Sequence, residues 1–254
     1  MPTVECHLIT CNDEDILPWT LKHYATFCSR IVVHDAFSCD QTRNIARRFG
    51  AQLVDLVDDG DINDRILSHI KDTAWIGTKA DWVICVDCDE LVYFPGDTRI
   101  TLARALEQGI AVVKPRGFEM FSESWPKGNG HDQIYDHIKM GAPDDKWYAK
   151  PALFTPHLVA EMRYSPGAHS CRYKRKGFDD WLESGTEPNT QDPVYMLHYK
   201  HIGPIERIAR VYDEKLARLS TTNKVNGWGN FEPGLKHAQD KRNAILSRLM
   251  RVVE

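Results

Sequence analysis

The sequence predicts an α/β fold, in which helices flank a mostly parallel central sheet and a helical segment follows at the C-terminal end. Strand and helix patterns alternate with short connections over the first 90 residues, as parallel strands joined by crossover helices require. Residues 82–86 are apolar throughout, which is typical of a central strand covered on both faces. Polar residues follow each predicted strand, at the edge where open α/β sheets bind ligands.

Four strand-and-helix units are predicted within the first 90 residues. Apolar and β-branched residues cluster between turn residues in four places. These predicted strands lie at residues 4–11, 30–34, 52–57 and 82–86. The first connecting helix should begin at Asp13, and the second should be capped by Asp40 and ended by Gly50. A third helix, at about residues 63–76, leads into the fourth strand.

The second half has a less regular pattern. Helices are predicted at residues 101–108 and from Pro204 onward, and short strands at residues 110–118, 152–155 and 195–202. Residues 119–146 are rich in aromatic residues and glycine and are predicted to form a long loop. A loop of this length inside a compact domain usually forms a lid or a binding segment.

Composition excludes several classes of protein. The chain has 254 residues, 42% of them hydrophobic, and a formal net charge of −4, so it can bury a core but has no basic field for nucleic-acid binding. Neither a signal peptide nor an apolar window of about 18 residues is present, so we expect a cytoplasmic protein without a transmembrane segment.

Seven scattered cysteines fit free thiols in a reducing compartment. Cys85 and Cys88 form a C-x-x-C pair, but without a second pair buried thiols are favoured over a zinc site.

Three acids follow the fourth predicted strand, namely Asp87, Asp89 and Glu90. Asp87 and Asp89 are two residues apart, so on an extended backbone they point the same way and can share one divalent cation. Glu90 should then point away from both and serve as a supporting or structural acid. Two neighbouring carboxylates repel each other unless a metal, a cationic ligand or a shared proton lies between them.

Polar residues also follow the three earlier predicted strands. Because the carboxyl ends of parallel strands meet at one edge of a sheet, these residues together predict a cleft there. Each of them, taken singly, is more often a cap or turn residue. They are Thr10, Asn12 and Asp13 after the first strand, Asp35, Ser38 and Asp40 after the second, and Asp58, Asp59 and Asp61 after the third.

Two segments carry a resemblance to a known family. Residues 31–42 contain an acid followed by S-x-D-x-T, and residues 87–90 read D-x-D-E. These segments resemble the strand-two signature and the metal-binding element of GT-A glycosyltransferases of the family 2 type. The resemblance covers about residues 3–120. Beyond that it rests on smaller marks, which are Lys150-Pro151, Gly167-Ala168-His169 and His198-Tyr199.

The resemblance implies a metal-dependent hexosyltransferase. It would move a sugar from a nucleotide-diphosphate sugar, with a UDP-sugar as the expected donor, to a hydroxyl group of a glycan, a lipid-linked molecule or a protein. A bridging Mn²⁺ or Mg²⁺ would absorb the charge of the leaving group. The implied metal ligands are Asp87, Asp89 and His198, with His169 as the alternative histidine. For the nucleotide sugar, the resemblance implies that Asp35 contacts the base and that Asp87 lies near the ribose. Thr10 and Asn12 are added as residues at a strand end, and Arg65 and Lys150 as cations that could reach the donor, although a solvated position explains these two nearly as well.

Residues 1–254 are expected to form a single domain of this type. Its parts would be a nucleotide-sugar-binding half at residues 1–120, an acceptor half at 121–203 and C-terminal helices at 204–254. Trp125, in the predicted loop, offers an aromatic face for an acceptor sugar. An inverting transfer needs a base, for which Glu119 and Asp132 are the candidates, whereas a retaining transfer need not use either.

The C-terminal stretch at residues 236–251 mixes apolar residues with several cations. A solvated helix packed through one apolar stripe is the favoured interpretation. Peripheral contact with a membrane surface, close to a lipid-linked acceptor, is the alternative.

Three other classes of protein are compatible with parts of this pattern. A D-x-D phosphatase normally carries Thr or Val two positions after the second acid and uses the first strand, whereas here the position is Leu91 and the strand is the fourth. A nucleotidyltransferase usually has a glycine-rich basic loop after its first strand, and the turn at residues 11–14 has neither feature. A catalytically silent nucleotide-sugar-binding domain remains the main alternative, although the presence of both Asp87 and Asp89 argues against it.

Overall fold

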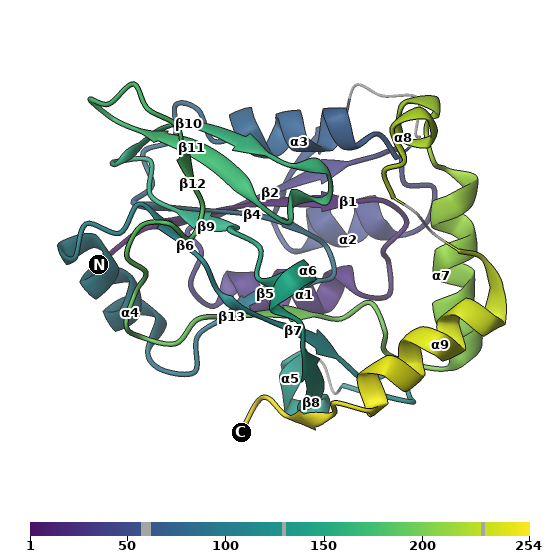
Figure 1. The fold of residues 1–254 in the computed structure, drawn as a ribbon. Coiled ribbons are helices and arrows are strands. Elements are labelled where there is room, and N and C mark those ends of the chain that lie inside the picture. The colour runs from purple at the N-terminus through teal and green to yellow at the C-terminus, as the bar shows by residue number, and fades with distance from the viewer. Residues whose placement is uncertain (57–61, 129–130, 230–231) are drawn as a thin grey trace.

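The computed structural model describes residues 1–56, 62–128, 131–229 and 232–254. Its central sheet contains six strands (Figure 1). They lie in the order β3 (Gln52–Asp55), β2 (Arg30–Asp35), β1 (Val4–Thr10), β4 (Trp82–Asp87), β9 (Leu153–Phe154) and β6 (Val112–Val113). The first four are parallel, and β9 runs antiparallel to both of its neighbours. The predicted α/β class with a mostly parallel sheet is confirmed.

The register of the parallel strands places their carboxyl ends side by side. Thr10 lies opposite Asp35, and the neighbouring Ile9 lies opposite Asp87. The strand β4 is buried on both faces, because Ile84 packs with α1 and α2 while Val83 and Cys85 pack with the β10–β11 pair. The apolar run in the sequence therefore reflects two separate cores, one on each side of this strand.

A second sheet of five strands continues directly from the first. Its order is β14 (Met250–Arg251), β8 (Met140–Pro143), β7 (Arg116–Met120), β13 (Tyr195–His198) and β5 (Glu90–Tyr93). The chain turns at residues 88–89, between β4 and β5. In the middle of this sheet, His198 on β13 lies opposite Glu90 on one side and Glu119 on the other.

Helices cover both faces of the central sheet. On one side lie α1 (Leu17–Ala25), α2 (Thr42–Arg48) and α4 (Thr98–Glu107), and on the other lies α3 (Asp64–Thr73) (Figure 1). A small antiparallel sheet packs beside α3 and consists of β10 (Val159–Tyr164), β11 (Cys171–Arg175) and β12 (Leu182–Glu183), with a short 3-10 turn, η1, at Pro166–Ala168. Asn63 and Asp97 cap α3 and α4, since their side chains accept backbone N–H bonds in the first turn. The Asp97 cap starts α4 earlier than the predicted residue 101.

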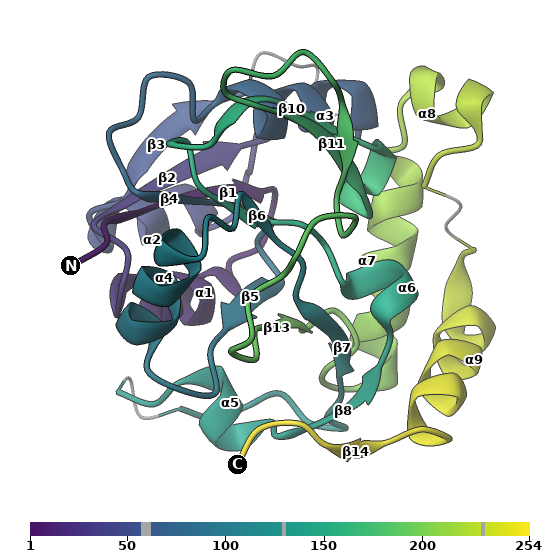
Figure 2. The ribbon, with the colours of Figure 1, turned by 60° about the vertical axis from the view of Figure 1, so that its left-hand side comes forward.

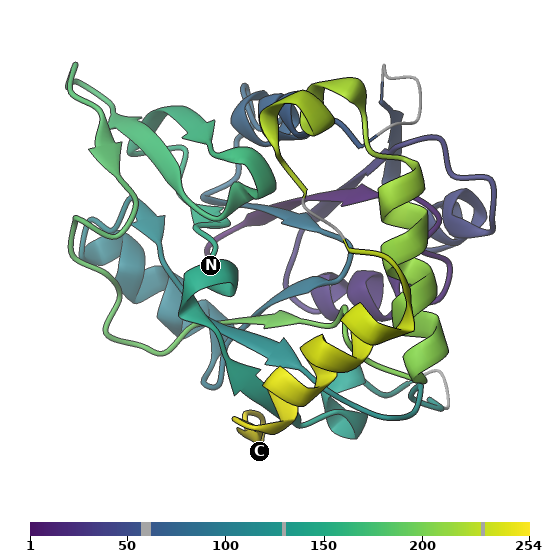
Figure 3. The ribbon, with the colours of Figure 1, turned by 45° about the vertical axis from the view of Figure 1, so that its right-hand side comes forward.

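Three helices near the C-terminal end form a separate layer. These are α7 (Ile205–Ala217), α8 (Thr221–Asn226) and α9 (Gly234–Leu246). Figures 2 and 3 show α7 and α9 side by side, where Ile208 and Tyr212 of α7 pack against Ala238 of α9. In the described part of the chain, every helix is too short or too polar to cross a membrane.

Several predicted elements differ from the observed ones. The predicted loop at residues 119–146 contains α5 (Ile134–His137), β8 and the first part of α6 (Asp145–Tyr148). The strand β8 was missed because it is short and because its pairing with β7 holds it in place, rather than a sequence pattern of its own. The predicted strand at residues 110–118 is divided into β6 and β7 at Pro115, which has no N–H to donate to a sheet. The predicted acids Asp58, Asp59 and Asp61 lie outside the described residues.

The buried histidine His23 makes stability depend on pH. Its Nε2 lies 3.0 Å from the carbonyl oxygen of Val92, and burial lowers the pKa of His23 from 6.5 to about 4. Protonation is therefore easier in the unfolded chain than in the folded one. We expect His23 by itself to lower the free energy of unfolding by about 3 kcal/mol as the pH drops from 6.5 to 4. Burial also lowers the pKa of His34 to about 4, so this second histidine adds to the fall. Urea unfolding at a series of pH values measures this change.

The matched variants are His23→Gln, which keeps an N–H donor, and His69→Gln on the exposed surface of α3. His23→Gln should reduce the fall in stability between pH 6.5 and 4 by about 3 kcal/mol, and His69→Gln should leave it as in the wild type. Equal pH profiles for wild type and His23→Gln would contradict this account.

Candidate active site

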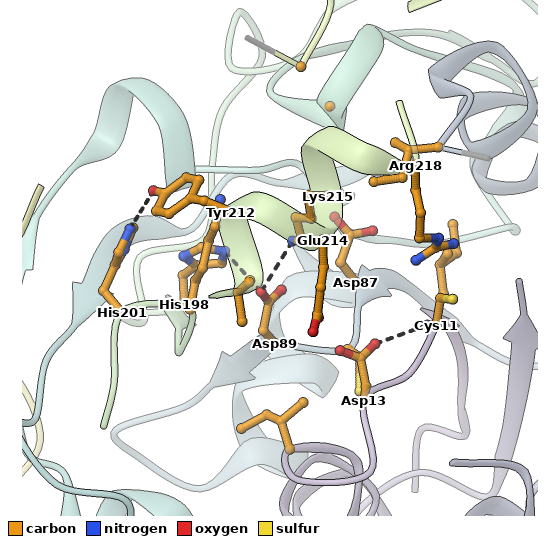
Figure 4. A pocket seen from close by; sticks show the side chains of 18 of the residues that line it. Cys11, Asp13, Asp87, Asp89, His198, His201, Tyr212, Glu214, Lys215 and Arg218 are labelled. Carbon is orange, nitrogen blue, oxygen red and sulfur yellow. Dashed lines mark hydrogen bonds and ion pairs between the residues drawn. The ribbon is translucent and has the colours of Figure 1, made fainter. Parts of the chain in front are cut away.

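A cleft of about 1210 Å³ opens at the carboxyl ends of β1 and β4. The loop after β1 and the turn after β4 form one side of it, and α7 and α9 form the other. In Figure 4, Asp13, Asp87 and Asp89 rise from the sheet edge, and Lys215 reaches toward them from α7. The cleft thus lies where the strand-end residues predicted it.

Asp87 is held by two lysines. Its Oδ1 lies 2.7 Å from Nζ of Lys71, and its Oδ2 lies 3.5 Å from Nζ of Lys150. Burial opposes the charge on this carboxylate, but the two lysines outweigh it and hold the pKa of Asp87 well below its usual range. The negative charge of Asp87 is therefore already compensated by the protein.

Lys71 was not singled out in the sequence. It is buried on α3, four residues after Leu67 and one after Ile70, so it stands on the apolar stripe of that helix. A cation on an apolar stripe is the signal that could have identified it, because a buried charge needs a partner.

Asp89 faces a histidine from the second sheet. Its Oδ2 lies 3.6 Å from Nε2 of His198 and 4.0 Å from Nζ of Lys215 (Figure 4). Burial opposes ionisation of Asp89, but His198 and Lys215 outweigh it and lower its pKa. The pKa of His198 is raised in turn, because the neighbouring carboxylates of Glu119 and Asp89 outweigh the effect of burial on this histidine.

Two groups of side chains among the described residues could hold a metal ion. One is Asp89, Glu90 and His198, and the other is Glu119, His198 and His201. Asp89 and His198 are thus brought together as expected, whereas Asp87 belongs to neither group. The two cysteines of the C-x-x-C pair are buried free thiols and also belong to neither.

The expected orientation of Glu90 was wrong. Its carboxylate forms an ion pair with Lys150 and accepts the backbone N–H of Asp87 at 3.0 Å. The chain turns at residues 88–89 instead of continuing as an extended strand, so the alternation of side chains on which the expectation depended does not apply. Glu90 is buried and joins the same network as its neighbours.

Glu119 lies between two histidines. Its Oε2 is 2.8 Å from Nδ1 of His198, and its Oε1 is 2.6 Å from Nδ1 of His201. The ring of Tyr148 stacks on His198 with the centroids 4.1 Å apart. His201 was missed in the sequence, although the spacing of two histidines three residues apart at the end of a predicted strand was visible there.

The residues predicted to bind the nucleotide sugar occupy different places. Thr10 and Asn12 line the cleft, and so does Lys150. Asp35 is buried beside Arg43, whose Nη1 lies 2.6 Å from its Oδ2, and it is not part of the cleft wall. Arg65 is exposed on α3 and also lies outside the cleft wall.

Of the candidate acceptor and base residues, Glu119 lines the cleft, and the other two lie elsewhere. Trp125 lies beneath the guanidinium of Arg207, 4.2 Å from the ring centroid, and Asp132 contacts His137 at 3.1 Å. Neither Trp125 nor Asp132 lines the cleft, whereas His169 does. For Glu119 and Asp132, the role of base stays a prediction.

The wall formed by the C-terminal helices is rich in cations. Within the predicted stretch 236–251, Lys241 and Arg248 line the cleft, while the apolar side of α9 is buried through Ala238 and Ile245. Burial and the neighbouring Lys215 lower the pKa of Lys200, on the same side, to about 7. A cleft with acids on one wall and cations on the other suits a ligand that carries phosphate groups together with a metal.

No protein-family model and no curated protein sequence matches the chain. Solved structures do match, including glucosyl-3-phosphoglycerate synthase from Mycobacterium tuberculosis in complex with Mn²⁺, uridine diphosphate and glucosyl-3-phosphoglycerate. That structure is 21% identical, and the match covers 46% of this chain and 44% of that one with a TM-score of 0.34. A structure described as a mycobacterial protein is 20% identical, with 47% and 42% coverage and a TM-score of 0.35. The matches span less than half of the length of these structures, so the activity of this chain has to be inferred from its own cleft.

The pairing of Lys71 with Asp87 leads to a stability prediction. Lys71→Met keeps the apolar stem and removes the charge, which leaves Asp87 with the contact to Lys150 and the more distant Lys215. We expect a loss of about 1–3 kcal/mol in the free energy of unfolding at pH 7, measured by urea denaturation. Lys79→Met, at an exposed position, is the control and should change stability little. If the two variants were equally stable, the Lys71–Asp87 pair would not contribute to stability.

Proposed function

We propose that this chain is a metal-dependent glycosyltransferase of the GT-A type. It transfers a hexose from a nucleotide-diphosphate sugar, with a UDP-sugar as the preferred donor, to a hydroxyl group of an acceptor. The observation that carries the proposal is the placement of Asp89 and His198, with 3.6 Å between their facing atoms, at the carboxyl edge of the sheet beside a large cleft. This edge is where ligands bind in open α/β folds.

The donor set of Asp89 and His198 fits a divalent cation. A separation of 3.6 Å is too long for a hydrogen bond, but it is close to the spacing of two ligands that each lie about 2.2 Å from one ion. A carboxylate with an imidazole favours Mn²⁺ over Mg²⁺, which prefers oxygen ligands. When bound, the metal would neutralise negative charge on the diphosphate leaving group.

The remaining residues of the cleft would bind and orient the donor. Lys150 and Lys215 stand beside the two aspartates and offer positive charge to the diphosphate. Thr10 and Asn12 form the wall next to the end of β1, where the nucleoside would lie. The role of Asp87 near the ribose is part of this proposal, supported by its position at the end of β4, next to the end of β1. The expected contact of Asp35 with the base has no such support, because Asp35 is buried beside Arg43 and outside the cleft wall.

The other parts of the chain would form the acceptor side. Residues 121–203 and the C-terminal helices close the cleft opposite the strand ends and would shield the reaction from water. A glycan, a lipid-linked molecule and a protein side chain all offer the hydroxyl group that the transfer requires. We propose that residues 1–254 act as one domain, since the main hydrophobic core joins residues from Val4 to Val253.

A catalytically silent nucleotide-sugar-binding domain is the second candidate, because the same cleft could bind a donor without turnover. Thermal denaturation and donor hydrolysis, each with and without Mn²⁺, distinguish the two. The panel contains UDP-glucose, UDP-galactose, UDP-N-acetylglucosamine and GDP-mannose. A transferase should hydrolyse its preferred donor slowly in the presence of Mn²⁺, and a binding domain should show stabilisation alone.

The proposal predicts a specific dependence on the metal and on Asp89. A donor at about 100 times its dissociation constant should raise the free energy of unfolding by about 2.7 kcal/mol. EDTA or Asp89→Ala should abolish most of this gain, and hydrolysis should fall by at least about 100-fold. Asp180→Ala, at an exposed turn position, is the matched control. The proposal fails if no nucleotide sugar stabilises the protein, or if the stabilisation is unchanged by EDTA and by Asp89→Ala.

A further inference from the structure

His198 belongs to a chain of buried side chains along the wall of the cleft. The chain runs from Glu119 at the end of β7 through His201 to Tyr212 on α7, and we call these four residues the histidine relay. Glu119 and His201 are each 3% exposed, His198 is 5% exposed and Tyr212 is 3% exposed. Such a polar chain is costly to bury unless each member has a partner.

The distances in the histidine relay define which nitrogen carries a hydrogen. An ionised carboxylate can only accept hydrogen bonds, so Nδ1 of His198, hydrogen-bonded to Glu119 at 2.8 Å, must carry the hydrogen. Nδ1 of His201 lies 2.6 Å from the other carboxylate oxygen of Glu119, as an ion-pair contact. Nε2 of His198 is then the nitrogen left to bind a cation, and it is the atom that faces Asp89. Nε2 of His201 accepts from the hydroxyl of Tyr212, 2.6 Å away (Figure 4).

We propose that Glu119 is a positioning residue for the metal-binding His198, and that His201 and Tyr212 hold Glu119 in place from the side of α7. This inference rests on the proposed function, because it takes Asp89 and His198 as the ligands. A carboxylate that accepts from the far nitrogen of a metal-binding histidine fixes the orientation of the ring and increases its basicity as a ligand. The stacked ring of Tyr148 restricts His198 further.

This role replaces that of base for Glu119. Each of its carboxylate oxygens lies within 2.8 Å of a histidine nitrogen, and the residue is almost completely buried. A base has to come within hydrogen-bond reach of the acceptor hydroxyl. Glu119 instead acts through His198, and it links the C-terminal helix α7 to the ligand set at the edge of the sheet.

Glu119→Gln tests the inference with little change in shape. The amide has one oxygen that accepts and one nitrogen that donates, so it can serve the Nδ1 hydrogen of only one histidine. We expect the affinity for Mn²⁺ to fall by about 10–100-fold. Electron paramagnetic resonance of the free ion, in titrations of the whole chain with Mn²⁺ alone and with Mn²⁺ and UDP, measures this affinity without any turnover.

The matched control is Glu14→Gln, which removes the same charge from the exposed lip of the cleft. The carboxylate of Glu14 accepts the N–H of Gln41 and lies outside the histidine relay. Glu14→Gln should bind Mn²⁺ as the wild type does. A wild-type affinity in Glu119→Gln, or an equal loss in both variants, would overturn the inference, as would the binding of a second Mn²⁺ ion that depends on Glu119.

Two further measurements keep the result interpretable. The metal-free unfolding midpoint of Glu119→Gln shows whether the variant is folded. If it is not folded, the second variant is Tyr212→Phe, which removes only the hydroxyl at the far end of the histidine relay. A weaker Mn²⁺ affinity in Tyr212→Phe would support the inference, and an unchanged affinity would overturn it.

If the wild type does not bind Mn²⁺ through Asp89, the proposed function fails. If it does, and Glu119→Gln has no effect, only the role of Glu119 fails.

Discussion

The parallel pairing of β1 with β2 and β4 is the constraint on which the rest of the structure depends. Parallel strands all end at the same edge of a sheet, and the register places Thr10 beside Asp35 and Ile9 beside Asp87. Because β4 is covered on both faces, polar groups cannot lie within it and are found only after its last buried residue. The cleft therefore forms where the buried part of the sheet ends and backbone and side-chain polar groups become accessible.

The second constraint is the turn between β4 and β5. It directs the chain out of the first sheet and into the second, so Asp87, just before the turn, and Asp89, within it, have different neighbours. Asp87 remains with lysines that pack on the first sheet, while Asp89 faces His198 from the second. The candidate metal ligands thus come from two sheets, and their spacing depends on how β13 pairs with β5 and β7.

Charge compensation explains how so many acids share one region. Four of these carboxylates each have a basic partner within 4.0 Å: Asp87 has Lys71, Glu90 has Lys150, Asp89 has His198 and Glu119 has His201. Asp13, by contrast, has its pKa raised to about 6 by burial and by the nearby Asp89. Buried charges are tolerated only when they are paired and hydrogen-bonded. The site is consequently a balanced network, in which the loss of one partner affects several neighbours.

The sequence by itself determined the α/β class, the succession of the first four strands along the chain and the polar strand ends, because these follow from local periodicity and from short connections. It also singled out Asp89, His198 and Lys150, which line the cleft. Only the tertiary structure decided that Glu119 contacts His198, since these residues are 79 positions apart and meet through strand pairing that no local pattern specifies. The orientation of Glu90 and the partners of Asp87 were likewise decided by the turn and by a lysine from a distant helix. Local chemistry predicts which residues are polar and where strands end, whereas sheet pairing selects which of them come into contact.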